Sequence, residues 1–339
     1  MTPKISICMP TYNFEQYLPE AIVSVLQQEF ADFEFLIVDD HSTDRSFDVI
    51  EGFARKDARI RAIANSGNVG MVNNWNRCLA LARGEYVKFL FGDDALGSAK
   101  ALAEMTTVLD ANPDVSLVAS ARTIIDYRSH PLRTVGSYED GRVYRGTDVI
   151  VDCLVEQRNR IGEPSAVLFR RKQAARGFDA RYRQLVDLEL WCHLLEQGDF
   201  AYIDRPLVSF RVHERQQTSR NMLNPDLIDE PFLLLDEYGR KPYVRLSGAM
   251  RKFMHAMPAY AVWKLYRKHH RIGRKEALDL IRARHGLVSF FLSYPLFKLY
   301  KIYMQSFGGN RATAPRATGM VRPGSDRARS YRFPTGGRP

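Results

Sequence analysis

Two adjacent carboxylates, Asp93 and Asp94, close the apolar run FLFGDD at positions 89–94. Paired carboxylates can hold a hard divalent cation such as Mn²⁺ or Mg²⁺, because these ions prefer oxygen ligands. A structural alternative is a turn before a helix, with Ser98 as the helix cap. The two interpretations differ in whether other polar residues lie near Asp93 and Asp94 in the fold.

Three further polar clusters follow apolar segments in the same way. They are PTYN at 10–13, DDHSTD at 39–44 and NSGNVG at 65–70, with FGDD at 91–94 as the fourth cluster. The apolar segments are short and rich in β-forming residues, which predicts strands at 4–9, 33–38, 59–64 and 85–91. Helical periodicity lies between them, at about 15–29, 45–56 and 71–83. This alternation predicts a parallel α/β sheet with right-handed crossovers.

In such a sheet, ligands bind outside the carboxyl ends of the strands, so we expect the four clusters to line one site. Single clusters have simpler explanations: Asp39 and Asp40 can form an Asx-turn, and NSGNVG can be a plain Gly/Asn loop. Their joint occurrence at one edge favours a binding site.

The glycine-rich cradles that bind phosphates directly are absent from this sequence. It has no GxGxxG after the first strand and no GxxxxGK[ST]. Carboxylates can instead hold a cation, which in turn meets a diphosphate. The sequence therefore predicts a metal–nucleotide substrate.

The net charge of the 339 residues is +10, and it is unevenly distributed. Residues 1–239 hold 27 Lys and Arg against 36 Asp and Glu, whereas residues 240–339 hold 22 against 3. This asymmetry predicts an acidic body with a basic extension that meets an anionic partner. A solvated basic surface is the alternative.

The four cysteines stand far apart without a CxxC pair, at positions 8, 78, 153 and 192. This spacing argues against a zinc ribbon or a disulfide framework and fits a reducing compartment. The N-terminal MTPKISICMPTYN lacks the long apolar stretch of a signal peptide. We therefore expect a cytoplasmic protein, or one that faces the cytoplasm.

Four segments follow one another in this order: ISICMPTYN, FLIVDDHSTD, NVGMVNNWN and GEYVKFLFGDD. In this order and spacing they resemble the donor-binding half of a family 2 glycosyltransferase, closely over residues 4–125 and with further motifs to about 218. The resemblance implies a GT-A nucleotide-diphospho-sugar transferase fold, which is Rossmann-like with a mostly parallel sheet. It also implies an inverting enzyme that moves a sugar from a nucleotide-diphosphate sugar to an acceptor hydroxyl, in cell-surface polysaccharide or lipid-linked glycan synthesis.

The resemblance implies roles for individual residues of this sequence. Asp39 and Asp40 would contact the base and ribose of the donor, with a UDP-sugar as the first choice. Asp93 would bind the donor through the metal, with Asp94 as its companion and Mn²⁺ or Mg²⁺ as the ion. The remaining donor-binding residues would be Pro10, Thr11, Tyr12, Asn13, Asn68 and Asn76.

Two positions depart from the family pattern. Phe91 replaces the first acid of the common Asp-x-Asp motif, so Asp93 alone remains of the two acids. Trp75 stands where many members have arginine, so we expect a different phosphate contact there.

The second half of the chain carries the implied catalytic base. LVDLELWCHLLEQGDF at 185–200 predicts a helix whose inward residues are Leu188, Trp191, Cys192 and Leu195. It resembles the family's helix that bears the base, and Asp187 aligns with that residue, whereas Glu189 points elsewhere on the helix. An acid favoured by the helix dipole is the alternative for Asp187.

Two further segments of the second half resemble family elements. SFRVHERQQTS at 209–219 resembles an Arg-x-His element, in which His213 would help to hold the metal or the diphosphate, with Arg211 in support. A purely structural histidine is the alternative. GEPSAVLFRR at 162–171 resembles the family's strand near the site.

These features predict three parts of the chain. Residues 1–220 form the catalytic domain, with donor binding in 1–125 and the acceptor and base region in 126–220. Residues 221–307 form a mainly helical basic extension, and residues 308–339 form a disordered basic tail.

The basic extension contains LVSFFLSYPLF at 287–297, which is shorter than the roughly 20 apolar residues that span a bilayer. Its apolar residues, flanked by Lys and Arg, suit a helix that lies on an anionic membrane surface. We therefore expect peripheral association with the inner face of the membrane, and packing on the catalytic domain is the alternative.

Two other functions remain open from the residues alone. A nucleotidyltransferase acting on sugar phosphates also uses acids and a metal, but PTYN stands where its triphosphate loop would lie. A polyanion-binding or nucleic-acid-binding protein is suggested by the pI of about 9.4. The positive charge is confined to the C-terminal part and no known binding motif is present, so nucleic acid is not an expected partner.

Overall fold

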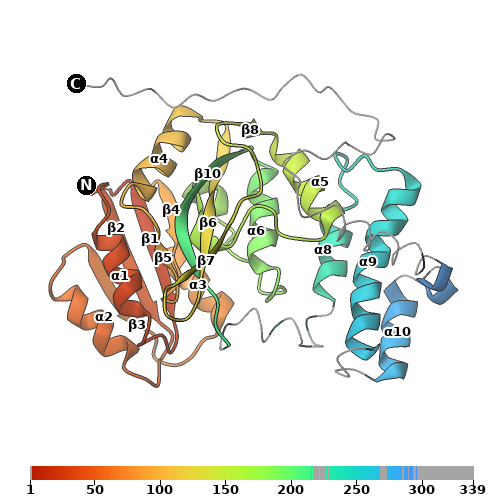
Figure 1. Cartoon of the computed structure of the whole chain (residues 1–339), viewed down its shortest axis with the longest axis horizontal. Helices are drawn as coiled ribbons and strands as arrows, with labels where there is room; N and C mark the ends of the chain where they lie inside the picture. The colour runs from red at the N-terminus through yellow and green to blue at the C-terminus, as the bar shows by residue number, and fades with distance from the viewer. Residues whose placement is uncertain are drawn as a thin grey trace. The chain divides into compact units, whose positions relative to one another are not determined.

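The computed structural model describes residues 2–214, 216, 221, 224, 227, 229–267, 273–284, 286–288, 290–292 and 295. These residues form two compact units (Figure 1). The first unit contains the described residues up to 150 and those from 159 to 216, and the second contains 151–158 and the described residues beyond 216. The expected basic tail at 308–339 lies outside the described residues.

The first unit is built on a ten-stranded sheet (Figure 1). Its strands are β1 (Ile5–Thr11), β2 (Phe33–Asp39), β3 (Ile60–Ala64), β4 (Tyr86–Phe89), β5 (Ala95–Leu96), β6 (Val115–Ile125), β7 (Pro131–Val135), β8 (Val143–Tyr144), β9 (Val167–Arg170) and β10 (Asp199–Arg211). The order is β3-β2-β1-β4-β9-β6-β10-β5, with β7 paired to β6 and β8 paired to β10.

The strand directions confirm the predicted α/β sheet. β1 runs parallel to β2 and β4, β2 runs parallel to β3, and β6 runs parallel to β10. β9 is antiparallel between β4 and β6. Each strand predicted in the first hundred residues is present, with ends within two residues of the prediction.

Helices connect these strands and cover both faces of the sheet. They are α1 (Leu18–Leu26), α2 (Ser46–Ala54), α3 (Met71–Leu81), α4 (Ala101–Ala111) and α6 (Val186–Leu195). A further helix, α5 (Gly146–Glu156), begins in the first unit, and its residues from 151 belong to the second. Because side chains alternate along β1, Ile5 and Ile7 join a buried cluster with α1, α2 and α4. Cys8 points to the other face, where its thiol lies 3.7 Å from the Cys78 carbonyl of α3.

The structural alternative is present in part: the Asp94 N–H donates to the Phe91 carbonyl at 3.0 Å in a turn, and Ser98 Oγ accepts from the Lys100 N–H at 3.2 Å just before α4. Asp93 and Asp94 are followed by the short strand β5, and α4 begins only at Ala101, without a side-chain cap. The acids therefore belong to the loop at the sheet edge.

The second unit is helical in its described part. Its helices are α8 (Glu230–Tyr238), α9 (Gly248–Arg267) and α10 (Arg274–Arg284). Their small apolar core contains Phe232, Ala259, Val262, Ala277, Ile281 and Phe290. None of the described helices is long and apolar enough to cross a membrane.

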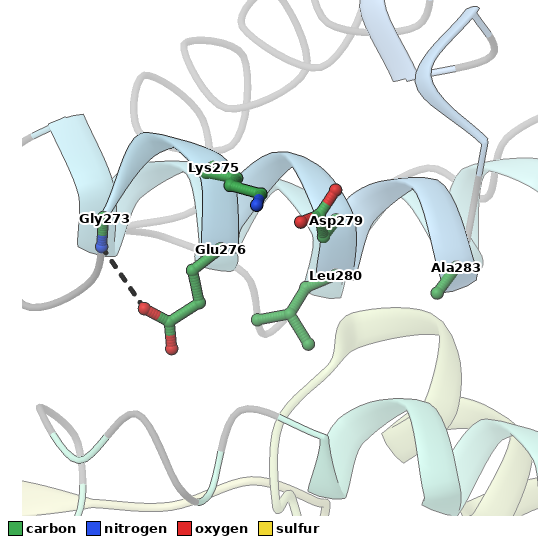
Figure 2. Close-up of a pocket in the computed structure, with 6 residues that line it drawn as sticks. All are labelled: Gly273, Lys275, Glu276, Asp279, Leu280 and Ala283. Carbon is green, nitrogen blue, oxygen red and sulfur yellow. Dashed lines mark hydrogen bonds between the residues drawn. The ribbon is translucent and has the colours of Figure 1, made fainter.

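A shallow hollow of about 670 Å³ lies beside α10 (Figure 2). Its lining residues are Gly273, Lys275, Glu276, Asp279, Leu280 and Ala283. Glu276 reaches back to accept a hydrogen bond from the Gly273 N–H at 3.3 Å, which closes the start of the helix. Because one helix and its leading glycine supply the whole lining, we assign this hollow no ligand.

Candidate active site

The carboxyl ends of the parallel strands meet at one edge of the sheet, as the sequence predicted. Thr11 at the end of β1 stands beside Asp39 at the end of β2, and Asp39 stands beside Ala64 at the end of β3. On the other side of β1, Phe89 at the end of β4 stands beside Cys8. The four polar loops therefore start at neighbouring points.

Hydrogen bonds tie the first two loops together. Asn13 Oδ1 accepts from the Thr43 N–H at 2.8 Å, and the Asn13 N–H donates to Ser42 Oγ at 2.9 Å. Asp39 accepts from the Ser42 N–H at 2.8 Å and from Ser42 Oγ at 2.5 Å. Its backbone partner lies three residues on, whereas the Asx-turn that the sequence left open bonds two residues on. Asn13 and His41 have φ of 57° and 61°, an uncommon conformation that is concentrated at functional sites.

The carboxylate of Asp40 fixes the third loop. It is buried and accepts from Asn65 Nδ2 at 2.6 Å and from the Val69 and Gly70 N–H groups at 2.8 and 2.9 Å. Asn68 Nδ2 donates to the Asp40 carbonyl at 3.0 Å. Gly70 has φ of 85°, which a residue with a side chain rarely adopts. Asp40 therefore fixes the conformation of the loop at 65–70.

The remaining donor-site candidates differ in how far their side chains are exposed and in their hydrogen-bond partners. Pro10 and Thr11 are buried at the end of β1, whereas the Tyr12 side chain is 45% exposed at the edge. Asn76 Nδ2 donates to the Phe178 carbonyl at 2.9 Å, and its Oδ1 accepts from the Phe178 N–H at 2.7 Å. Asn76 therefore holds the loop that contains Phe178, and its donor contact stays a prediction.

The two departures from the family pattern lie against each other. The ring centroids of Trp75 and Phe91 are 4.8 Å apart, and Trp75 also packs on Phe178 at 5.2 Å. Trp75 is 9% exposed, whereas Phe91 is only half-buried. An aromatic contact therefore stands where the resemblance implied an arginine and an acid.

Asp93 and His213, 120 positions apart in the chain, face each other at 3.1 Å between Oδ2 and Nε2. A carboxylate oxygen and an imidazole nitrogen are both ligands of divalent cations. Across the described residues, no three His, Cys, Asp or Glu side chains gather as a complete metal cluster. The pair therefore offers two protein ligands, and oxygens of a substrate and of water would have to complete the shell of a cation.

Asp94 is buried beside this pair. Its Oδ1 accepts from the Arg211 N–H at 2.9 Å, and its Oδ2 has no hydrogen-bond partner among the described residues. Burial and the charge of Asp93 raise the pKa of Asp94 well above its usual range. Because a cation would counter both effects, Asp94 fits the role of a companion acid.

Arg211 fixes the Asp93 loop from the end of β10. Its side chain is 1% exposed, and Nε donates to the Asp93 carbonyl at 2.7 Å. Its Nη1 donates to the Asp126 carbonyl at 3.1 Å and to Ser129 Oγ at 2.8 Å, and its Nη2 pairs with Glu20 at 2.6 Å. The guanidinium therefore joins α1, the turn after β6 and the acid loop.

The candidate base Asp187 stands in the first turn of α6. Its Oδ2 accepts from Asn159 Nδ2 at 2.9 Å, and its Oδ1 accepts from the Leu188 N–H at 2.7 Å. Although part of the side chain reaches the surface, burial of the carboxyl raises the pKa of Asp187 to about 7, and the charge of Glu163 adds to this. A carboxylate with a pKa near neutrality is suited to proton transfer.

The packing of α6 agrees with the sequence-based prediction. The four residues expected to face inward are buried, namely Leu188, Trp191, Cys192 and Leu195. Glu189 is also fully buried and pairs with Arg176 Nη2 at 2.6 Å. Glu189 and Asp187 therefore have separate partners.

Several residues of the site carry no signal in a motif. Lys88 is buried on β4, where its Nζ donates to the Ser165 carbonyl and burial lowers its pKa to about 7. A lysine inside the apolar run EYVKFLF could have drawn attention to it. Asn159 and Glu163 lie in an irregular segment, and nothing local distinguishes them.

The chain matches the family model "Glycosyl transferase family 2" over residues 6–174. The uncharacterized protein MT1568 of Mycobacterium tuberculosis is 30% identical over 236 residues, which are 65% of this chain and 70% of that protein. TuaG of Bacillus subtilis, whose name proposes a glycosyltransferase of teichuronic acid biosynthesis, is 28% identical over 205 residues, 59% of this chain and 75% of that protein.

Solved structures are similar over most of the chain. S. aureus TarS 1-349 in complex with UDP-GlcNAc has a TM-score of 0.63 at 18% identity, over 83% of this chain and 81% of that one. Mannosyltransferase PcManGT from Pyrobaculum calidifontis, in complex with GDP-Man and Mn²⁺, has a TM-score of 0.56 at 17% identity, over 90% and 83%.

The described sheet is therefore that of a GT-A transferase, as the sequence predicted. The chain belongs to glycosyl transferase family 2, and it is a glycosyltransferase.

Proposed function

We propose that this enzyme moves a sugar from a nucleotide-diphosphate sugar, with a UDP-sugar as the first choice, to an acceptor hydroxyl with inversion. The observation that carries the proposal is the Asp93–His213 pair, at 3.1 Å, on the sheet edge where the loops after the parallel strands start. The nucleotide sugars in complex with TarS and PcManGT support this choice of donor.

We assign the divalent cation, Mn²⁺ or Mg²⁺, to Asp93, with His213 and Asp94 in support. The donor set of carboxylate oxygens and one imidazole fits such an ion, as does the buried Asp94 Oδ2 that has no described partner. The Mn²⁺ of PcManGT supports the assignment. When bound, the ion supplies positive charge against the departing diphosphate.

Asp187 takes the proton from the attacking hydroxyl in this proposal. The carboxylate accepts hydrogen bonds on both oxygens, which holds it in one orientation and leaves further lone pairs for the acceptor. Attack from the face opposite the diphosphate inverts the anomeric configuration. The family membership favours this reaction over a nucleotidyltransferase and over polyanion binding.

We place the acceptor in cell-surface polysaccharide or lipid-linked glycan synthesis. The name of TuaG supports this class of acceptor. The acidic body of residues 1–239 does not attract an anionic glycan, whereas the basic extension does.

The first test is metal-dependent donor binding. A nucleotide sugar at about 100 times its dissociation constant should stabilise the protein by roughly 2.7 kcal/mol, but only with Mn²⁺ or Mg²⁺ present. Thermal unfolding is measured with UDP-, GDP- and dTDP-sugars, with each metal and with EDTA. If no donor shifts the midpoint with either metal, the proposed donor site is wrong.

We also propose that the basic extension binds an anionic membrane surface at the inner face of the membrane. Residues 240–301 hold 15 Lys and Arg against Glu276 and Asp279. Among the described residues after α10, Val288 and Leu292 are 76% and 74% exposed, and Phe291 is 50% exposed. Apolar side chains beside basic ones suit the headgroup boundary of a bilayer.

Flotation with liposomes tests this surface. Binding to vesicles with anionic lipid should gain about 1 kcal/mol per basic residue near the surface and weaken in high salt. Val288→Asp with Leu292→Asp should remove most of the binding without disturbing a core, because both side chains are exposed. The matched control is Leu132→Asp on β7, where the side chain is 54% exposed. Binding that ignores lipid charge or survives the double substitution would contradict the proposal.

A further inference from the structure

The loop that meets the candidate base is folded around Asn159. Its Oδ1 accepts from the backbone N–H groups of Ile161 and Gly162, both at 3.0 Å. Its Nδ2 donates to the Gly162 carbonyl at 3.0 Å and to Asp187 Oδ2 at 2.9 Å. Because two N–H donors require an oxygen acceptor, the amide has one orientation, and its NH₂ group faces Asp187.

The same loop is tied to α6 at a second point. Trp191 Nε1 donates to the Gly162 carbonyl at 3.1 Å, and Trp191 is four residues after Asp187, on the same side of the helix. Gly162 has φ of +130°, a conformation that L side chains rarely adopt. The loop and the helix are therefore held together, with the Asn159 amide between them.

Burial and a nearby negative charge both disfavour the ionised form of Asp187, and the Asn159 amide opposes them. Glu163, in the same loop, acts on Asp187 with its negative charge and pairs with Arg122 of β6 at 2.5 Å. Burial and Glu163 raise the pKa of Asp187, whereas the donors Asn159 and the Leu188 N–H favour its ionised form.

We propose that Asn159 is a positioning residue for Asp187, whose amide holds Oδ2 so that the carboxylate keeps one orientation and stays available to accept a proton. The inference rests on the proposed role of Asp187 as the base. Asn159 acts through Asp187, and we propose no contact between Asn159 and the donor.

The test compares two substitutions of Asn159. Asn159→Asp keeps an oxygen for the two loop N–H groups but sets a second carboxylate against Asp187. Asn159→Ser keeps a short acceptor for the loop and is too short to replace the amide at Asp187. The matched control is Asn112→Asp at the end of α4, where Nδ2 donates to the Val108 carbonyl at 2.7 Å.

Turnover is measured as release of nucleoside diphosphate from the donor, with water as the acceptor, across pH. We expect a loss of about 100-fold for Asn159→Asp and about 10-fold for Asn159→Ser, with donor affinity within about twofold of wild type. The acid limb of the pH–rate profile should move to higher pH in both variants, and further in Asn159→Asp. Asn112→Asp should change none of these quantities.

An unchanged acid limb in both Asn159 variants would overturn the proposal. The double variant gives a second check. If Asn159→Asp lowers the turnover of Asp187→Asn as much as it lowers that of wild type, the proposal is overturned, because a residue that acts through Asp187 has no further effect once Asp187 is replaced. If Asn159→Asp does not fold, Asn159→Ser and the thermal measurement below carry the test.

A second measurement needs no donor. The stabilisation that Asp187→Asn gives should grow with pH and level off at the pKa of Asp187, because only the ionised carboxylate is disfavoured in the folded state. In the Asn159→Ser background, the pH at which this stabilisation stops increasing should be higher. If that pH is the same as in wild type, the inference is overturned. If wild-type protein neither binds nor turns over any donor, the proposed function fails, while this measurement still decides whether Asn159 acts on Asp187.

Discussion

Replacing Asp187 by asparagine is expected to lower turnover by about 10²–10⁴-fold, which is the usual contribution of a positioned base. Asparagine has the shape of aspartate but cannot accept a proton at neutral pH. Donor affinity should change little, because Asp187 lies on α6 and not on the donor loops. Steady-state release of nucleoside diphosphate measures turnover, and calorimetry measures donor affinity.

The pH dependence of the same variant has a definite sign. Burial raises the pKa of Asp187 to about 7, compared with about 3.9 for an unfolded chain. Below pH 3.9 the group is protonated in both states, and above it the folded state increasingly loses stability until about pH 7. Asp187→Asn should therefore raise the unfolding midpoint at pH 8 and leave it unchanged near pH 4. Wild-type turnover should fall as the pH drops below about 7.

Glu189→Gln is the matched control for Asp187→Asn. Both residues are acids of the first turn of α6, but Glu189 is fully buried and pairs with Arg176 at 2.6 Å. Removing its charge leaves Arg176 without its carboxylate partner, which should lower stability with a much smaller effect on turnover. Equal turnover losses in the two variants, or near-normal turnover in Asp187→Asn, would contradict the assignment of the base.

The meeting of the four polar loops at one sheet edge could be predicted from the sequence because it follows from backbone periodicity. Short β-rich runs alternate with helical segments, and a parallel arrangement brings all their carboxyl ends together. The polar loops after β1, β2, β3 and β4 had to meet wherever those strands paired. The order of strands and the long return of β10 beside β6 involve contacts between distant residues, and no local pattern specifies them.

The inward or outward direction of single polar side chains could not be predicted in the same way. Asp40 stands in the expected loop and Asn76 stands on α3, but both use their polar atoms on backbone groups of other segments. That choice depends on which donors the folded chain brings within 3 Å. Asp93 and His213 show the opposite case: the resemblance assigned Asp93 to the metal and His213 to the metal or the diphosphate, and their side chains meet at 3.1 Å.

The contact of Trp75 with Phe91 also needed the structure. Each was visible in the sequence as a separate departure from the family pattern, in α3 and after β4. Only the packing of α3 on the sheet shows that they form one aromatic contact of 4.8 Å. The two departures are therefore one feature of the folded protein, a contact between two aromatic rings.

Replacing Asp93 by alanine is expected to abolish the metal-dependent part of donor binding. The stabilisation of roughly 2.7 kcal/mol at 100 times the dissociation constant corresponds to about 5–10 °C in the unfolding midpoint, and it should disappear. His213→Ala should weaken the metal dependence and not abolish it, because the Asp93 and Asp94 oxygens remain. Thermal unfolding with donor and a titration of Mn²⁺ measures both effects.

The protein without donor separates loss of a ligand from loss of folding. The charge of Asp93 helps to raise the pKa of Asp94, so removing Asp93 relieves a repulsion while it breaks the contact with His213. These two effects oppose each other, and the unfolding midpoint without donor should stay close to that of wild type. Asp48→Ala is the control, because Asp48 lies on α2 with its side chain 71% exposed. A full metal-dependent shift in Asp93→Ala, or an equal loss in Asp48→Ala, would exclude Asp93 as the residue that holds the cation.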